Sequence, residues 1–383
     1  MTYLSGTVNR LRKFGKTFTL IEIIASDRKS FYKTLAYRGR TVQIKPGDYI
    51  SCYATESHYL GKEEYLCSAI SILPRRKGSA QKKQPPHMAR SSAELEKLYA
   101  RSIFEQALQD EAHHQNFLPV KSPTVVNRWP EGNTTPFNLD FYRNPSCLTI
   151  SNMIYHQMML HHGFNKIYEI GKLFRKENPS THKRLAEFTI FGIAMSCPEL
   201  DVVMKEMEHI IIGALNSLNK SGLRHIVFPA QPTFERITFT DLLMRSRVDN
   251  LTGSQLTKPV RDYLNDNYSS FVWVTNFPDE TRPFYIHSIN GTCNDCQLWY
   301  RGRIYIAAGG MVEPDKQAYE PRMRGRGQNP AHFRNYLHYP ALGMPTMGQI
   351  DFGIERLLAA ISDESFTAEF TWFPRYESAA IEP

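Results

Sequence analysis

The amino-acid sequence predicts an α+β protein in which an antiparallel β-sheet flanked by helices follows a small N-terminal β-barrel of the OB-fold type. Residues 1–74 consist of short β-rich runs separated by turn residues. Residues 75–92 are basic and rich in Pro, Gly and Ser, which indicates a linker. In residues 93–383, helical and extended segments are mixed without βαβ regularity, which favours an antiparallel sheet in a second domain.

The barrel prediction depends on runs rich in β-branched and aromatic residues. The runs are TFTLIEII at 17–24, TVQIKPGDYISCYAT at 41–55 and EYLCSAISIL at 64–73. About five short strands in this length favour a small barrel, and a generic β-sandwich is the alternative. Phe18, Tyr32 and Tyr37 have rings that can stack on nucleic-acid bases or pack in the core.

The linker is followed by a series of helical and extended segments. We expect helices at 92–115, 148–164 and 198–218, extended segments at 117–126, 166–177, 184–196, 270–277, 284–289 and 303–310, and a strand or turn entering a helix at 348–362. A polar loop joins 166–177 to 184–196, so these two strands should form a long antiparallel hairpin. The basic linker itself is either a solvated tether or a contact to the phosphate backbone of a nucleic acid.

Composition limits the class of protein. The 383 residues are enough for two domains, and 42% hydrophobic with 22% charged residues is typical of a soluble globular protein. We find no apolar run long enough to cross a membrane and no signal-peptide core, so we expect a cytoplasmic protein. The formal net charge of +8 points to an anionic partner such as a nucleic acid or nucleotide.

Cysteine and histidine spacing gives little support for a metal site. The six cysteines are scattered, and one CxxC pair, Cys293 and Cys296, supplies too few ligands for a closed zinc site. We therefore expect two reduced cysteines in a loop. Adjacent histidines at 113–114 and 161–162 cannot share a helix face, so we expect them at the surface.

The predicted hairpin carries residues suited to ATP. An arginine offers a fixed fork for phosphate oxygens, and Arg175 comes just before the polar loop. Phe188, on the opposite strand, can stack on adenine, and Glu177 can accept from its amino group. Alone, this pattern also fits an ordinary surface ion pair on a hairpin.

The amino-acid sequence around the hairpin makes this pattern more specific. YEIGKLFRKENPSTHKRLAEFT at 168–189 resembles motif 2 of class II aminoacyl-tRNA synthetases of the aspartyl/asparaginyl/lysyl subclass. The resemblance covers almost the whole chain. The barrel resembles the anticodon-binding domain, FLPVKSP with Pro123 resembles motif 1, and WPEGNTTPFNLDFY resembles the flipping loop. LTISNMIYHQMM resembles the pocket helix of the asparaginyl type, FGIERLLAAI resembles motif 3, and TWFPRY resembles the C-terminal ending. It implies a class II synthetase-type antiparallel sheet, and a homodimer through motif 1.

The resemblance also implies which residues bind ATP. The implied set is Arg175, Glu177, His182, Arg184, Phe188, Glu355 and Arg356. Arg175 would hold the α-phosphate and the substrate carboxylate, and Arg356 the far phosphates, so these two are the expected catalytic residues. Glu177 would read adenine and Phe188 would stack on it.

This sequence differs from the family at the positions whose side chains hold Mg²⁺ on the phosphates. The expected Asp and Glu are Gln297 and Tyr305, and neither side chain is an ionised carboxylate, so Mg²⁺ would be held weakly there. Asp295 is a candidate substitute. Asp351 stands between Gly348 and Gly353, where an acid near a triphosphate is unhelpful unless it binds metal.

Several residues of the implied amino-acid pocket also differ from those of the family. The substrate-binding positions are Glu131, Ser151, Met153, His156 and Val312. His156 replaces a lysine, Val312 an arginine and Met153 a glutamine. These changes disfavour aspartate most, make asparagine a poor fit and favour a less polar or differently functionalised acid. A register shift of one residue is the alternative. Gly192 and Ala194 also replace the acidic residues expected after EFT.

The sequence thus favours a paralogue, an ATP-dependent adenylate-forming ligase with a changed acid substrate. Its acceptor would be a tRNA or a small-molecule amine, the latter as in tRNA-independent amide ligases of this fold. One alternative is a divergent but genuine asparaginyl-type tRNA ligase. Another is a non-catalytic tRNA- or protein-binding homologue. The barrel lacks the family's L-R-D pattern, so anticodon reading of the usual kind is not expected.

Overall fold

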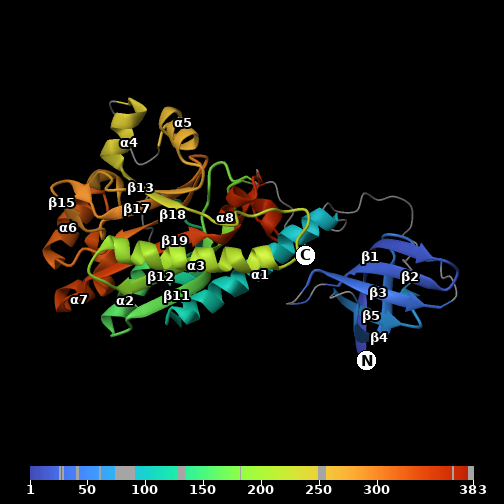
Figure 1. Ribbon diagram of the computed structural model, residues 1–383. Helices are drawn as coiled ribbons and strands as arrows, with labels where there is room; N and C mark the ends of the chain where they lie inside the picture. The colour runs from blue at the N-terminus through green and yellow to red at the C-terminus, as the bar shows by residue number, and fades with distance from the viewer. Residues whose placement is uncertain are drawn as a thin grey trace. The chain divides into compact units, whose positions relative to one another are not determined.

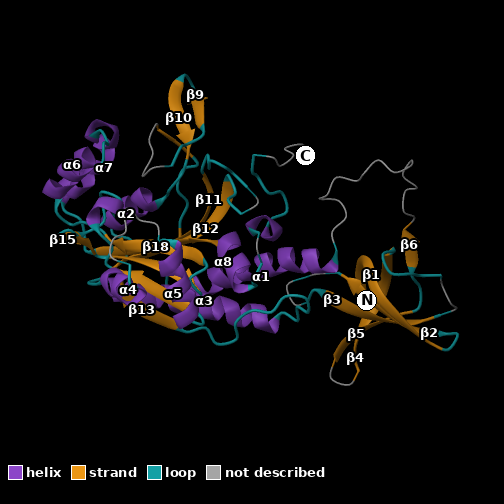
Figure 2. Ribbon diagram, turned by 90° about the horizontal axis from the view of Figure 1, so that it is seen from above, coloured by secondary structure: helices purple, strands orange, loops and turns teal. Residues whose placement is uncertain are grey.

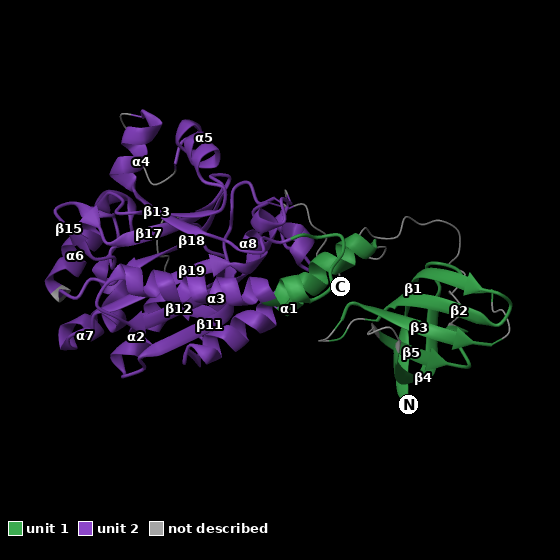
Figure 3. Ribbon diagram, viewed as in Figure 1, with its two compact units in different colours: residues 1–103, 217–227 green, residues 104–216, 228–383 purple. Residues whose placement is uncertain are grey.

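The chain folds into two compact units (Figure 3). In the computed structural model, the described residues are 1–25, 27, 30–39, 43–59, 62–73, 91–127, 134–181, 183–248, 256–364 and 366–377. The first unit comprises Met1–Ile103 and Ser217–Val227, and the second comprises Phe104–Asn216 and Phe228–Pro383. Of the expected linker, only residues 91 and 92 are described.

The N-terminal strands of the first unit close into a ring. The strands are β1 (Thr2–Phe14), β2 (Phe18–Ile24), β3 (Tyr32–Arg38), β4 (Tyr49–Tyr59), β5 (Lys62–Cys67) and β6 (Ser71–Leu73). Their order is β1-β2-β3-β5-β4-β6, and β1 also pairs with β4, which closes the sheet. The side chains of Val8, Ile21, Leu35 and Ile50 fill the interior. The predicted OB-type barrel is therefore confirmed, and the sandwich alternative is not needed.

All three candidate stacking aromatics have contacts within the first unit. Tyr37 is buried in the barrel core. The Tyr32 hydroxyl donates to Glu96 at 2.8 Å, and the Arg224 guanidinium lies 4.2 Å from the centre of its ring. Phe18 is partly exposed and packs beside Phe14, with ring centres 5.8 Å apart.

A mixed but mainly antiparallel sheet forms the centre of the second unit (Figure 1). Its order is β13-β14-β17-β18-β19-β12-β11-β7, and only the pairs β13–β14 and β11–β7 are parallel. The strands are β7 (Leu118–Pro119), β11 (Lys166–Phe174), β12 (Glu187–Ser196), β13 (Phe234–Thr238), β14 (Phe271–Thr275), β17 (Asp295–Tyr300), β18 (Ile304–Met311) and β19 (Met347–Gly353). This arrangement confirms the predicted α+β class and the β11–β12 hairpin.

Helices and smaller sheets cover this sheet. The helices are α1 (Ser92–His114), α2 (Met153–His161), α3 (Leu200–Lys220), α4 (Phe239–Ser246), α5 (Lys258–Asn267), α6 (Lys316–Gly325), α7 (Arg334–Leu342) and α8 (Ile354–Ile361), with short 3-10 turns η2 (Asp279–Thr281), η3 (Pro330–Phe333) and η4 (Thr367–Phe370). The small sheets contain β8 (Val125–Asn127), β9 (Asn138–Phe141), β10 (Asn144–Leu148), β15 (Ser288–Ile289) and β16 (Thr292–Cys293). No helix among the described residues is long and apolar enough to cross a membrane.

The two faces of the large sheet are covered differently. Helix α3 lies on one face, where a methyl group added to Gly348 would come within 2.8 Å of Val203. Helix α2 and the sheet β8-β10-β9 lie on the other side (Figure 2). Since Asp351 is three residues after Gly348 on β19, its side chain points to this second face.

Several local predictions were wrong. Helix α2 begins at Met153 rather than at residue 148, and only Ser288–Ile289 of the segment 284–289 is a strand. Cys293 and Cys296 are free, as expected, but they lie buried in β16 and β17 rather than in a loop. Helices α4 to α7 were not anticipated.

Candidate active site

The β11–β12 hairpin brings the residues of its two ends together. Leu173 pairs with Phe188 across the strands, so Arg175, just past β11, lies beside the start of β12. The Arg175 guanidinium carbon lies 5.3 Å from the centre of the Phe188 ring. Its Nε and Nη2 donate to the Ile150 carbonyl at 3.3 Å, which fixes the side chain against the segment before α2.

A cavity of about 230 Å³ opens over this end of the sheet. Eight of the residues predicted to bind nucleotide or substrate line it: Ser151, Met153, Arg175, Glu177, Arg184, Phe188, Glu355 and Arg356. Two further predicted residues, Glu131 and His182, lie outside the described residues. The structure therefore brings residues from the hairpin, the start of α2 and the start of α8 to one cavity.

Arg356 enters the cavity from the first turn of α8. Its guanidinium carbon lies 5.7 Å from the centre of the Tyr305 ring, and we find no ion pair between it and a described carboxylate. Burial lowers the pKa of Arg356 from its usual value, although a guanidinium remains charged at any physiological pH. A partly buried cation with an aromatic neighbour and no ion pair to a described carboxylate is suited to a bound phosphate.

Glu355, the neighbour of Arg356, has a structural contact. It is buried, and its carboxylate accepts from the backbone amide of Thr189 at 3.0 Å. This bond joins the first turn of α8 to β12, next to Phe188. Glu355 thus fixes the relative position of the Phe188 strand and the Arg356 helix.

A second cavity, of about 890 Å³, adjoins the first and shares Arg175 and Arg356 with it. Its basic lining residues are Arg175, Lys183, Arg184, Arg261, Arg282, Arg303 and Arg356. Acidic lining residues are fewer, and one of them, Asp363, is paired with Arg303 at 3.0 Å. A polyanion such as a triphosphate matches this lining.

The residues at the expected Mg²⁺ position do not fit a tightly held cation. Gln297 accepts from the Trp299 indole at 3.3 Å, and Tyr305 lies beside Arg356. Asp295 is occupied: it pairs with Arg282 at 2.6 Å and accepts from the Phe277 amide at 2.9 Å. Burial raises the pKa of Asp295 to about 6 despite the nearby arginine. The described residues contain no group of acidic, histidine or cysteine side chains arranged to hold a metal ion.

His156 does not line the cavity. It is fully buried, and its Nε2 lies 2.9 Å from Glu169 Oε2. Glu169 also accepts from Asn152 at 3.0 Å and from the Ser122 amide at 2.9 Å. Burial alone would raise the pKa of Glu169, but these hydrogen bonds, led by that from His156, lower it to about 2. The network joins α2 to β11 behind the cavity.

The substrate end of the cavity is mainly apolar. Met153 lines it together with Pro283 and Tyr285, and the Tyr285 hydroxyl lies 3.3 Å from the Met153 sulfur. Val312 is 3% exposed and packs in an apolar cluster with Met347 instead of facing the cavity. Of the three replaced pocket positions, only Met153 thus borders the cavity.

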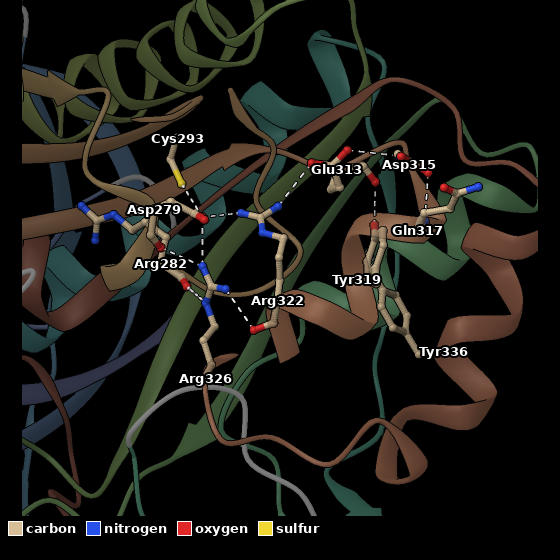
Figure 4. A network of polar contacts seen from close by, with 10 residues as sticks. All are labelled: Asp279, Arg282, Cys293, Glu313, Asp315, Gln317, Tyr319, Arg322, Arg326 and Tyr336. Atoms are coloured by element: carbon tan, nitrogen blue, oxygen red, sulfur yellow. Dashed lines mark hydrogen bonds and ion pairs between the residues drawn. The ribbon is translucent and has the colours of Figure 1, made fainter. Parts of the chain in front are cut away.

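Sequence reasoning missed the contribution of residues 283–285. They follow η2, which a polar network fixes in place (Figure 4). Asp279 of η2 pairs with Arg326, the residue after α6, at 2.9 Å, and Arg326 donates to the Arg282 carbonyl at 2.7 Å. The sequence offered a weak signal, because Phe284 and Tyr285 are apolar residues beside a conspicuous run of charges.

Comparison with known proteins agrees with this geometry. Residues 81–377 match a sequence model of the family described as tRNA synthetases class II (D, K and N). The aspartate–tRNA(Asp/Asn) ligase of Methanopyrus kandleri is 28% identical over 286 residues, covering 72% of this chain and 66% of the relative. The aspartate–tRNA(Asp) ligase of Pyrococcus abyssi is 28% identical over 297 residues, covering 72% and 67%. These matches span about two thirds of the relatives' own length.

Solved structures share the fold over nearly the whole chain. Asparaginyl-tRNA synthetase from Pyrococcus horikoshii, complexed with asparaginyl-adenylate, superposes with a TM-score of 0.80 at 16% identity, covering 99% of this chain and 95% of that chain. The asparaginyl-tRNA synthetase of Entamoeba histolytica, also complexed with asparaginyl-adenylate, has a TM-score of 0.78 at 17% identity, covering 100% and 96%. At this identity the likeness establishes the fold.

Proposed function

The chain belongs to the class II tRNA synthetase family (D, K and N), and from that membership we propose that it is an ATP-dependent ligase that activates a carboxylic acid as an acyl-adenylate. The observation that carries the proposal is the convergence of Arg175, Phe188 and Arg356 on one cavity. It joins a planar surface for a purine to two cations for phosphates. Such an arrangement supports binding of ATP in one orientation.

The proposed reaction is an in-line displacement at the α-phosphorus. A carboxylate oxygen of the acid forms a bond to this phosphorus, the bond to the bridging oxygen breaks, and pyrophosphate leaves. Arg175 would hold the carboxylate and the α-phosphate together, which removes much of the entropic cost of the encounter. Arg356 and the arginines of the second cavity would stabilise the charge on the departing pyrophosphate.

Mg²⁺ has no well-formed protein ligands in this scheme. The family generally uses Mg²⁺ with ATP, but Gln297 and Tyr305 replace the carboxylates, and Asp295 is paired with Arg282. We therefore assign the binding of the far phosphates to Arg261, Arg303 and their neighbours rather than to a protein-held ion.

The acid is proposed to be less polar than aspartate. The end of the cavity next to Met153 and Tyr285 offers thioether, aromatic and proline surfaces. Leaving a side-chain carboxylate there without a cation would cost several-fold or more in affinity. The adenylate would then pass its acyl group to a small-molecule amine or to a tRNA, with release of AMP.

The same membership suggests the roles of the remaining parts. The barrel, residues 1–74, is proposed as a nucleic-acid-binding domain of the OB type, and residues 93–383 as the catalytic domain. The segment around Pro123 is proposed as the dimer interface of a homodimer. Under this proposal, Glu131 would meet the amino group of the substrate, as the resemblance implies.

Isotope exchange tests the proposal directly. Pyrophosphate exchange into ATP is measured with the twenty standard amino acids and related acids at high Mg²⁺. Exchange that depends on one or a few acids supports adenylation. Exchange with none of them, in a chain that still binds ATP, would favour a second candidate, a non-catalytic tRNA- or protein-binding homologue, which the altered metal positions permit.

Assays with different acceptors then distinguish a tRNA ligase from a tRNA-independent amide ligase. Acylation of bulk tRNA would favour a divergent asparaginyl-type tRNA ligase. AMP release that depends on an added small amine, without tRNA acylation, would favour a tRNA-independent amide ligase. We favour the second outcome because the barrel lacks the family's usual L-R-D pattern.

A further inference from the structure

Two uncharged polar side chains, Gln297 and Tyr305, lie where the resemblance places the carboxylates that hold Mg²⁺. Both line the second cavity, and Tyr305 also lines the first. They share one face of the large sheet, because Gln297 and Trp299 alternate on β17 and Trp299 pairs with Tyr305 on β18. A register shift at Ile306 breaks the alternation on β18, and this bulge turns Tyr305 onto the shared face.

The Trp299 indole fixes the orientation of the Gln297 amide. An indole N–H can only donate a hydrogen bond, so the Gln297 atom that it contacts at 3.3 Å is the amide oxygen, Oε1. Gln297 is only 7% exposed, and we find no acceptor for its amide nitrogen among the described residues. The polar group that Gln297 can still offer to the second cavity is thus an N–H donor.

The Tyr305 hydroxyl is a second donor. Its ring lies beside Trp299, with ring centres 5.8 Å apart, and the Arg356 guanidinium carbon lies 5.7 Å from the centre of the Tyr305 ring. We find no hydrogen-bond partner for the hydroxyl in the part of the chain that the structure describes. Burial raises the pKa of Tyr305, although nearby arginines, led by Arg356, partly oppose the rise. The hydroxyl therefore keeps its proton at neutral pH.

The charge around these two donors is mainly positive. Of the described residues that line the second cavity, seven are basic and three are acidic. Asp295, the candidate substitute for a metal ligand, lines neither cavity and is paired with Arg282 at 2.6 Å. A cation would lie here among like charges, whereas the oxygens of a triphosphate would accept from the donors and attract the arginines.

We propose that this chain binds the triphosphate of ATP without a protein-held metal ion, with the Tyr305 hydroxyl and the Gln297 amide donating to phosphate oxygens beside Arg356. The inference rests on the proposed function, because that function identifies ATP as the ligand. Two acceptors that need a bridging cation are replaced by two donors that bind the anion directly. Uncomplexed ATP, which carries more negative charge than its Mg²⁺ complex, is then the preferred form of the nucleotide.

Calorimetry of the full chain tests the proposal without any substitution. ATP is titrated into wild type in EDTA and, separately, in excess Mg²⁺, in buffers of equal ionic strength because charge interactions are screened by salt. We expect ATP to bind in EDTA at least as tightly as in Mg²⁺. Weaker binding in EDTA than in Mg²⁺ would overturn the proposal.

Two variants test the roles of the donors. Tyr305→Phe removes the hydroxyl and keeps the ring, so ATP binding in EDTA should weaken by about 10- to 100-fold. Gln297→Asp combined with Tyr305→Glu introduces two carboxylates, which repel the phosphates unless a cation bridges them. The double variant should therefore bind ATP weakly in EDTA and recover affinity in Mg²⁺. A merely structural role of the two residues would not create this dependence on the metal ion.

A matched tyrosine provides the control. Tyr263 packs against the same apolar cluster as Tyr305 but lines neither cavity, so Tyr263→Phe should bind ATP as wild type does. Unchanged ATP affinity of Tyr305→Phe in EDTA, or an equal loss in Tyr263→Phe, would overturn the assignment of the hydroxyl. A folded double variant whose ATP binding ignores Mg²⁺ would overturn the exchange of acceptors for donors.

The remaining outcomes separate this inference from the proposed function. If circular dichroism shows that the double variant does not fold, the wild-type comparison and Tyr305→Phe still decide the inference. If wild type binds ATP at least as tightly in EDTA but catalyses no acid-dependent pyrophosphate exchange, the proposed function fails and the inference stands. If ATP binds in neither buffer, both fail.

Discussion

At the scale of single residues, Arg356 is a partly buried cation that forms no ion pair with a described carboxylate. Its guanidinium lies beside the Tyr305 ring, and glutamine keeps part of the arginine stem, so removing the charge need not open a large void. We expect Arg356→Gln to weaken ATP binding by about 10- to 100-fold, since hydrogen bonds to charged groups contribute roughly 1.5–3 kcal/mol. Calorimetric titration with ATP measures the change.

A matched arginine provides the control for this variant. Arg324 on α6 is exposed and pairs with Glu320 at 3.1 Å, so Arg324→Gln should bind ATP as wild type does. If Arg356→Gln retains wild-type ATP affinity, the placement of Arg356 at the phosphates is wrong.

The raised pKa of Asp351 predicts a pH dependence of stability. Between about pH 4 and 7, the folded protein keeps a proton on Asp351 that the unfolded chain has released. Stability should therefore fall as pH rises through this window, and the penalty is complete above about pH 7. The charged and titratable groups that face Asp351 are His156 on α2, Glu169 on β11 and Arg175 after it.

Asp351→Asn should remove this dependence. The thermal midpoint of the variant minus that of wild type should therefore increase from about pH 5 to pH 8, measured by circular dichroism in matched buffers. A difference that stays constant or shrinks with rising pH would show that Asp351 is ionised in the free protein with a near-normal pKa.

The hairpin residues were predictable and the surroundings of Asp351 were not. Arg175, Glu177 and Phe188 are close in sequence, and one hairpin register brings them together. Asp351 was recognised only as an acid near the phosphates. Its neighbour Gly192 lies on another strand, far away in sequence, and sequence alone does not give the pairing of β12 with β19.

At the scale of elements, a polar network joins η2 to helix α6 (Figure 4). Asp279 accepts from Arg322 and from Arg326, and Arg322 also pairs with Glu313 at 3.2 Å. These bonds hold the segment that leads to Tyr285 in the cavity wall. They also fix α6, which contains Pro321, to η2.

Removing the shared carboxylate should destabilise the second unit. We expect Asp279→Ala to lower the free energy of unfolding by about 2 kcal/mol, because two arginines lose their common partner. The value is below that of a fully buried pair, since the Asp279 side chain is 26% exposed. Urea denaturation measures it.

Helix α6 also supplies the control. Glu320→Ala breaks an exposed ion pair with Arg324 and should cost about 0.5 kcal/mol or less. Similar losses in the two variants would mean that the network adds nothing beyond surface charge pairing. The acid KM of Asp279→Ala should rise as well, because Tyr285 loses its support.

The elements that sequence reasoning missed share a physical cause. Helices α6 and α7 contain Pro321 and Pro340, which local propensity counts against a helix. The segment 284–289 alternates apolar residues as a strand does, but Phe284 and Tyr285 are buried in an aromatic cluster with Tyr319 and Phe333. Tertiary packing overrides the local pattern in each case, whereas the strongly periodic α3 and the hairpin needed no such help.

At the scale of the whole molecule, each unit has its own core and polar network. In the first unit, Glu96 accepts from the Tyr32 hydroxyl at 2.8 Å and from the amides of Arg224 and His225 at 3.0 and 2.7 Å. In the second, the described residues that line the two cavities lie between residues 134 and 367. Binding of ATP and of the acid is thus a property of the second unit.

Deletion of residues 1–90 should therefore preserve the proposed chemistry and remove only the proposed nucleic-acid contacts. The shortened chain keeps α1 from its first residue, Ser92, and loses Tyr32 as a partner of Glu96. We expect its ATP affinity and acid-dependent pyrophosphate exchange to stay within about twofold of wild type, since all the described residues that line the two cavities lie outside residues 1–90. Binding of bulk tRNA, if present in wild type, should fall with the loss of the barrel and the basic linker.

Full-length Tyr32→Phe is the control for the lost hydroxyl. Loss of exchange in the shortened chain, with native circular dichroism and with Tyr32→Phe unaffected, would show that the barrel takes part in activating the acid.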